Sequence, residues 1–267
     1  MKNKLKISGI TLLFLFIIQA CYKAPLEQPY RIKELNSLIL QANKAFERGQ
    51  NERAKNLYTE ALKKSRLIQD DNATVIILIS LSRLYTSEKQ IKEAKNFIDT
   101  AVELSKRASL PEETIEELDF ERARIGFIVN EDVEEFLRKL TLSEITSIKI
   151  KSLNLLARVR IKQNKNDEAE KLLNEALDIN QKMSRVEEAN SLRLLGIVYL
   201  DRDKKRAEDY FLRALEIDKE LAIPKKIALD MQTLAIFYEK IGDQEKAKEY
   251  LMRAHEIWNG LGKDDIE

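Results

Sequence analysis

Residues 194–218 read LLGIVYLDRDKKRAEDYFLRALEID, and residues 233–257 read TLAIFYEKIGDQEKAKEYLMRAHEI. Both begin with apolar residues three and four apart, which is typical of a helix that packs one face against a core. After a polar turn, each continues with two alanines seven residues apart, Ala207 and Ala214 in the first and Ala247 and Ala254 in the second. The shared spacing predicts one structure for both, a pair of antiparallel helices whose small residues let the two backbones approach closely.

The same spacing recurs along most of the chain. Residues 42–61, 81–101 and 156–176 fit the same frame. One alanine of each copy marks its position along the chain, and these marker alanines are Ala54, Ala94, Ala169, Ala207 and Ala247. Successive marker alanines lie 40, 75, 38 and 40 residues apart. The long interval predicts a further, degenerate copy in residues 111–142, with a long first helix, a short second helix and no alanine pair. Self-similarity at a fixed period favours a solenoid over an irregular bundle, so we expect six stacked hairpins.

This pattern resembles the tetratricopeptide repeat, a pair of antiparallel helices with small residues at the crossing. The resemblance implies an all-α fold, a right-handed α-solenoid of about six hairpins. The expected boundaries are repeats 1–2 in residues 31–110, the degenerate third repeat in 111–142, repeats 4–6 in 143–262 and a polar tail in 263–267. Other Ala-rich α-solenoids and irregular bundles are the alternatives, and five copies of one spacing weigh against both.

The N-terminus has the layout of a secretory signal. Three lysines precede the apolar run ITLLFLFII at residues 10–18, which is too short to span a bilayer as an ordinary helix. We therefore expect residues 1–20 to be a signal peptide. The sequence IIQAC at residues 17–21 resembles the lipobox of bacterial lipoproteins. That resemblance implies diacylglycerol on the thiol of Cys21, a further acyl chain on its amine, and a tether over residues 21–30. The alternative is an uncleaved helix with a reduced cysteine.

Composition excludes several classes of function. Removing residues 1–20 removes Lys2, Lys4 and Lys6 and no acid, so the 46 basic and 45 acidic residues become 43 and 45. A nearly neutral chain lacks the basic footprint of a nucleic-acid-binding protein, so we expect no nucleic-acid partner. The single cysteine also excludes an intramolecular disulfide.

No motif for catalysis, metal binding or cofactor binding occurs. His255 is the only histidine, which is too few for a zinc site in a chain with one cysteine. Neither G-x-S-x-G, G-x-x-x-x-G-K nor G-x-G-x-x-G is present. Nearly all of the carboxylates are expected on polar helix faces. We therefore predict no catalytic residues, no metal, no cofactor and no enzyme, and an unrecognised hydrolase is kept only as an alternative that measured turnover would reveal.

The first helix of each repeat is expected to line the concave side, because stacked hairpins curve and expose one row of helices there. Residues three and four apart on those helices share that face and predict a groove with an apolar floor, amides and scattered cations. The predicted groove residues are Arg83, Lys151, Asn154, Arg158, Asn190, Arg193, Leu194, Ile197, Gln232 and Ile236. Such a mixture suits an extended or helical peptide. The alternative for each residue is a purely solvated position.

Two arginines are the predicted centre of this groove. Arg158 and Arg193 lie beside amides and apolar residues, which favours a partner segment with both acidic and apolar residues, and neither arginine is expected to be needed for repeat packing. By contrast, i,i+4 pairs such as Glu134 with Arg138 are expected on solvated outer faces, where each adds only a few tenths of a kcal/mol.

These features predict a lipoprotein of the bacterial cell envelope that binds a protein or peptide partner and is held at a membrane by lipid on Cys21. Tyr22 follows the cysteine in place of the Asp that retains lipoproteins at the inner membrane, which favours the periplasmic face of the outer membrane where two membranes exist. The architecture resembles type IV pilus pilotins, repeat lipoproteins of outer-membrane barrel assembly, and adaptors for peptidoglycan hydrolases. No residue selects among them. A peptide-sensing cytoplasmic regulator is a further class, which the lipobox opposes.

Overall fold

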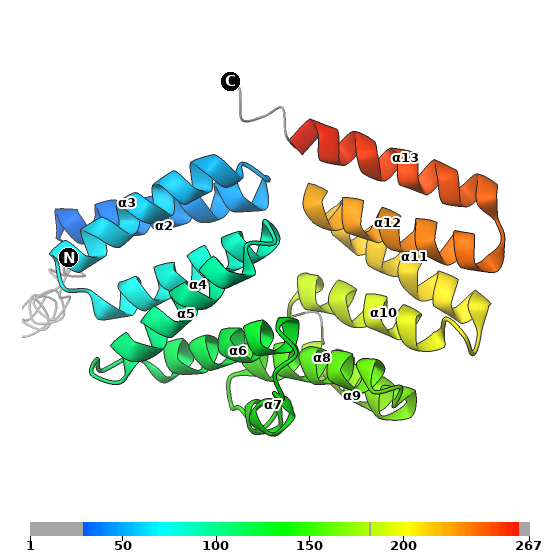
Figure 1. Cartoon of the computed structure of the whole chain (residues 1–267), viewed down its shortest axis with the longest axis horizontal. Helices are drawn as coiled ribbons and strands as arrows, with labels where there is room; N and C mark the ends of the chain where they lie inside the picture. The colour runs from blue at the N-terminus through cyan, green and yellow to red at the C-terminus, as the bar shows by residue number, and fades with distance from the viewer. Residues whose placement is uncertain (1–28, 182, 262–267) are drawn as a thin grey trace, which may run out of the picture.

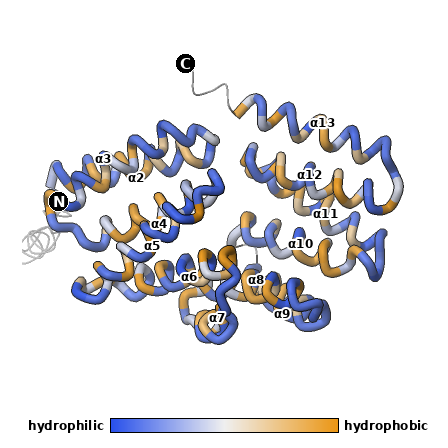
Figure 2. Tube along the Cα trace, in the orientation of Figure 1, coloured by the Kyte–Doolittle hydropathy of each residue, from blue (hydrophilic) through white to orange (hydrophobic). Residues whose placement is uncertain are grey.

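The computed structural model describes residues 29–181 and 183–261, and these residues form twelve α-helices with no β-strand among them. The helices are α2 Tyr30–Glu47, α3 Asn51–Leu67, α4 Asp71–Ser87, α5 Ile91–Ser105, α6 Glu112–Ile128, α7 Glu134–Leu140, α8 Thr146–Lys162, α9 Asn166–Asn180, α10 Arg185–Tyr199, α11 Lys204–Glu220, α12 Pro224–Ile241 and α13 Gln244–Leu261. Apolar and polar residues alternate along most of the helices (Figure 2), as the spacing predicts, although α4 has an unbroken apolar run at residues 75–79.

Consecutive helices pack as six antiparallel hairpins, from α2 with α3 to α12 with α13. Each hairpin also packs on the next, and the stack curves so that the first and sixth hairpins face one another (Figure 1). The predicted all-α solenoid of tetratricopeptide-like hairpins is therefore confirmed.

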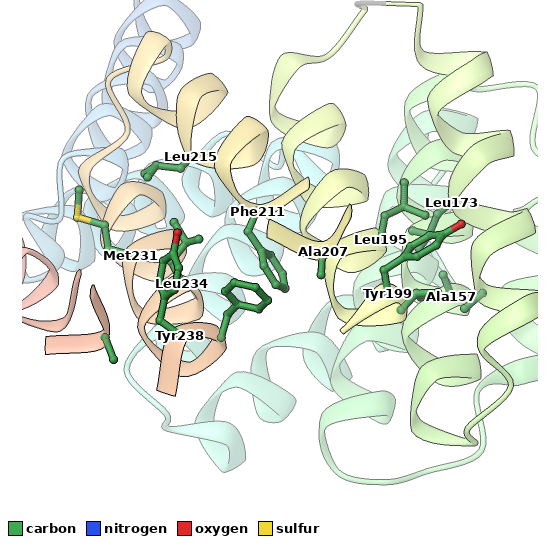
Figure 3. Packing of buried hydrophobic residues seen from close by; sticks show 14 of the residues in the cluster. Ala157, Leu173, Leu195, Tyr199, Ala207, Phe211, Leu215, Met231, Leu234 and Tyr238 are labelled. Atoms are coloured by element: carbon green, nitrogen blue, oxygen red, sulfur yellow. The ribbon is translucent and has the colours of Figure 1, made fainter. Parts of the chain in front are cut away.

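The small residues of the repeat lie where the helices cross. The first four marker alanines have no solvent-exposed surface, and Ala247 is also buried. In the fifth hairpin, Gly196 of α10 faces Phe211 of α11 so closely that a Cβ at residue 196 would lie 2.4 Å from the Phe211 ring. Figure 3 shows Phe211 and Ala207 within one apolar cluster with Leu195 and Tyr199. Close approach of the backbones is thus a direct consequence of glycine and alanine at the crossing.

The third hairpin departs from the others. Its first helix, α6, has 17 residues and its second, α7, has seven. In place of an alanine pair, Gly126 of α6 provides the close approach, since a Cβ there would lie 2.7 Å from Val133 at the start of α7. Only Leu137 and Leu140 of α7 are buried. This hairpin therefore holds its second helix by a much smaller apolar face.

The two ends of the solenoid touch each other, which the repeat pattern does not predict. The Lys225 ammonium donates a hydrogen bond to Asn51 Oδ1 at 2.7 Å and lies 4.6 Å from the centre of the Phe46 ring. Leu261, the last residue of α13, covers Gly49 in the α2–α3 turn, where a Cβ would lie 2.6 Å from Leu261 Cδ2. These five residues, here called the closure contact, join the first hairpin to the sixth, whose ends face one another in Figure 1, and so close the curved stack into a ring.

Several predictions fall on residues that the structure does not describe. The signal peptide, Cys21 and nearly all of the tether lie within residues 1–28, and the polar tail lies within 262–267. In the described part of the chain, no helix combines the length and apolar character needed to cross a membrane.

Candidate functional site: the central cavity

A cavity of about 790 Å³ lies inside the curve of the solenoid. Its wall contains residues of α2, α4, α6, α8, α10 and α12, the first helix of every hairpin. Eight of the ten predicted groove residues line it: Arg83, Lys151, Asn154, Arg158, Asn190, Arg193, Leu194 and Ile197. The other two, Gln232 and Ile236, line a separate pocket of about 540 Å³ between α12 and α13. The structure thus brings most of the predicted residues together in one place.

Arg193 is neutralised by the protein itself. Its guanidinium forms ion pairs with Asp218 of α11, at 2.7 Å, and with Asp230 of α12. Both carboxylates are buried, and burial together with the neighbouring Asp230 raises the pKa of Asp218 above its ordinary value. Removal of Arg193 would leave two buried acids unpaired. The expectation that Arg193 is not needed for repeat packing is therefore wrong, because this side chain joins three helices of two hairpins.

The cations near the third hairpin are also paired. Arg83 of α4 contacts both Glu117 and Glu121 of α6, with 3.2 Å between Arg83 Nε and Glu121 Oε2. Arg124 donates to Glu121 at 2.9 Å, and Lys151 of α8 lies 3.0 Å from Glu117. Arg83 and Lys151 lower the pKa of Glu117, although its burial acts in the opposite direction. Glu121 is fully buried and is therefore an exception to the expectation that nearly all carboxylates lie on polar helix faces.

The two predicted asparagines form internal hydrogen bonds. The Asn154 amide donates to Glu187 at 3.1 Å, and its carbonyl oxygen accepts from the Ser191 hydroxyl at 2.7 Å. Asn190 accepts from both Arg193 and Lys226, each at 3.0 Å. These amides therefore hold α8, α10 and α12 in register, in addition to lining the cavity.

Arg158 differs from the other cations of the cavity. In the described part of the chain it forms no ion pair and no hydrogen bond, and its guanidinium lies 4.9 Å from the centre of the Phe127 ring. The side chain stays open to solvent even though protein atoms crowd around it. This crowding and the charge of Arg124 lower the pKa of Arg158, which nevertheless stays a cation at neutral pH.

Sequence reasoning missed several residues of the cavity wall. Lys226 and Leu229 lie six and three residues before the predicted Gln232, so extending the same face of α12 toward its N-terminus would have found both. Phe120, Glu121 and Arg124 belong to the third hairpin, for which no stripe could be drawn without the marker alanines. These three residues could have been assigned to one helix face from their own spacing, because Phe120 and Glu121 lie four and three residues before Arg124 in α6.

The described residues contain no group of three or more His, Cys, Asp or Glu side chains placed to hold a metal ion. His255 is exposed on α13, away from the residues that line the central cavity. The arrangement supports binding by shape, charge and apolar contact.

Comparison with known families agrees with this geometry. A family model described as tetratricopeptide repeat matches residues 149–220, and a second with the same description matches residues 76–107 and 231–257. The chain carries tetratricopeptide repeats. A search of curated proteins gives no match.

Solved structures with similar folds include three proteins that share few identical residues with this repeat protein. The Rap protein complexed with Competence and Sporulation Factor has 15% identity and a TM-score of 0.59, covering 86% of this chain and 67% of its own. Aspartyl phosphate phosphatase F from Bacillus subtilis has 12% identity and a TM-score of 0.57, covering 94% and 75%. PilF of Pseudomonas aeruginosa has 13% identity and a TM-score of 0.51, covering 87% and 95%. At these identities the likeness shows the fold alone.

Proposed function

We propose that this tetratricopeptide-repeat protein is a lipid-anchored scaffold of the bacterial cell envelope that holds a segment of another protein in its central cavity. The observation that carries the proposal is the cavity itself, to which all six hairpins contribute. A surface assembled from every repeat suits a ligand longer than one side chain, and repeat arrays use their concave surfaces for such ligands. One protein of similar fold was solved in complex with Competence and Sporulation Factor.

The proposed location rests on the N-terminal sequence. Lipid on Cys21 would place the ring at a membrane surface, with residues 22–29 as a short spacer. Two or more acyl chains anchor a protein durably, whereas one holds it only marginally. The periplasmic face of the outer membrane is the proposed site in an organism with two membranes. There the scaffold would serve the assembly or regulation of an envelope complex.

The anchor and the cavity are tested separately. Cys21→Ser should abolish incorporation of radiolabelled fatty acid and leave an unprocessed precursor. Incorporation that persists in this variant would rule out lipidation at Cys21.

For the cavity, a photo-crosslinking amino acid is placed at Ile197, inside the cavity, or at Leu212 on α11, outside it. Both residues are 38% exposed, so they offer matched accessibility. In intact cells we expect a discrete crosslinked partner from position 197 and none from position 212. The same products from both positions, or a product from position 212 alone, would contradict binding in the cavity.

A further inference from the structure

Six cations line the central cavity, and five of them are compensated by the protein. Arg83, Arg124 and Lys151 share Glu117 and Glu121, while Arg193 pairs with Asp218 and Asp230. Lys226 donates a hydrogen bond to Asn190, and the negative charges of Asp218 and Glu187 stabilise its ammonium. Five positive side chains thus stand against five carboxylates. The charge that remains is that of the sixth cation, Arg158.

The environment of Arg158 leaves its hydrogen-bonding groups available. Phe127 lies against its guanidinium, a contact that stabilises a cation without using N–H donors. A guanidinium carries five donors in a rigid fork that matches a carboxylate through two parallel hydrogen bonds. Because Arg158 forms no hydrogen bond in the described part of the chain, the whole fork can meet a ligand.

Resting on the proposed function, we infer that Arg158 is the residue that recognises the partner, by binding the side-chain carboxylate of an Asp or Glu within an otherwise apolar segment. One uncompensated positive charge matches one carboxylate. Apolar residues line the cavity on both sides of Arg158, with Phe120 on α6 and Leu194 and Ile197 on α10. A segment that covers both sides must continue past Arg158 in both directions, which favours an internal acidic residue over a chain end.

Arg193, in contrast, acts as a structural cation. Its two buried carboxylates hold it in place, and the nearby Lys226 balances the second of them, so a third carboxylate would add like charge to a site that is already neutral. Recognition of the partner and packing of the repeats are thereby assigned to different arginines of the same cavity.

The test uses peptide pools, because it needs no knowledge of the natural partner. Three pools of nine-residue peptides have randomised apolar and small flanking residues. The first has Glu at the centre and blocked ends; the second has Gln at the centre and blocked ends; the third has Gln at the centre and a free C-terminal carboxylate. Retention by the full-length protein is measured for the wild type, Arg158→Gln and Arg213→Gln. Arg213 is an exposed arginine of α11 outside the cavity, and within residues 29–181 and 183–261 its only ion pair is with Asp209.

The wild type and Arg213→Gln should retain the Glu pool about tenfold better than the Gln pool, a difference of about 1.4 kcal/mol. Arg158→Gln should lose this preference and keep the circular dichroism spectrum of the wild type.

Equal retention of the Glu and Gln pools by the wild type would overturn the inference but leave the proposed function standing. Retention of no pool would overturn both. If Arg158→Gln still retains the Glu pool better than the Gln pool, Arg158 is not the residue that binds the carboxylate. If the wild type retains the third pool better than the first, the carboxylate that it binds is a chain terminus and not a side chain.

Discussion

Single residues of this protein take part in pairings that local spacing does not reveal. Glu134 fits an i,i+4 pair with Arg138, and the two are indeed 3.0 Å apart. The same carboxylate also accepts a hydrogen bond at 2.7 Å from Arg160 of α8, whose side chain is only 2% exposed. Glu168 of α9 completes the site at 2.8 Å from Arg160 Nε. Glu134 therefore compensates a buried charge, and the interpretation of its pair as a merely solvated one is wrong.

Glu134 makes the stability of the protein depend on acid. Hydrogen bonding from Arg160 lowers the pKa of Glu134 to about 2. Because the folded pKa lies below the unfolded value of 4.5, the stabilisation is complete above pH 4.5 and is lost as the pH falls toward 2. Glu134→Gln should cost roughly 1–3 kcal/mol in free energy of unfolding at neutral pH and should flatten this part of the pH profile.

Denaturant unfolding between pH 2 and 7 checks this prediction, with Glu135→Gln as the control. Glu135 is the next residue of the same helix, but its side chain is 88% exposed, and among the described residues its only ion pair is a 3.6 Å contact with Lys139. The two variants should differ clearly at pH 7. If they lose the same free energy of unfolding, Glu134 is not a partner of the buried arginine.

Single helices differ in how firmly the ring holds them. Hairpins with 15–18 residues in each helix bury a full stripe on both sides, whereas α7 has seven residues and buries two of them. Because the third repeat lacks the alanine pair that lets two helices pack closely, its sequence predicts that the solenoid is weakest over about residues 110–145. The structure excludes α6 from this predicted weak region, because the ion pairs of Glu117 and Glu121 hold α6 against α4 and α8. The weak element is α7, which has few helical hydrogen bonds and little apolar contact.

Hydrogen exchange should show this difference directly. Amides of residues 134–140 should exchange at least about tenfold faster than those of α6 and of α10–α13, since a tenfold difference needs only about 1.4 kcal/mol in opening free energy. Exchange followed by proteolysis and mass spectrometry resolves these segments. Protection of α7 equal to that of residues 190–255 would show that the short helix opens only with the whole protein.

At the scale of the whole molecule, the closure contact makes the solenoid a ring. Leu261 is 8% exposed, and its cover over Gly49 supplies the apolar part of this contact. Burial of a leucine side chain contributes about 1.5–3 kcal/mol, which is small beside the packing of neighbouring hairpins. The two ends of the solenoid are thus held together by the weakest interface of the fold. This interface adjoins the central cavity, because Phe46 belongs to the closure contact and also lines the cavity.

Leu261→Asp should open the ring without unfolding the hairpins, because it replaces the apolar cover of Gly49 with a carboxylate, which is costly to bury. Small-angle X-ray scattering should show a larger radius of gyration, while far-ultraviolet circular dichroism stays unchanged. Leu251→Asp is the control on the same helix, at a residue that is 44% exposed. Identical scattering curves for the Leu261 variant and the wild type would show that the closure contact does not hold the ends together.

Local sequence patterns suffice to predict the hairpins and the helix face that each presents to the cavity. Both follow from local spacing: small residues seven apart mark the helix crossing, and residues three or four apart share one face of a helix. This is why eight of the ten predicted groove residues line one cavity. Lipidation of Cys21 remains a prediction from its sequence motif.

The packing of distant helices, in contrast, sets which of those residues carry an uncompensated charge and how the ends of the solenoid meet. The partners of Arg193 lie 25 and 37 residues away, and Lys225 meets Asn51 across 174 residues. Periodicity says which way a side chain points, but a charge is compensated only when a second helix brings its partner within a few ångströms. The distance between Lys225 and Asn51 depends on the curvature accumulated over six hairpins, and no local pattern of residues encodes that curvature.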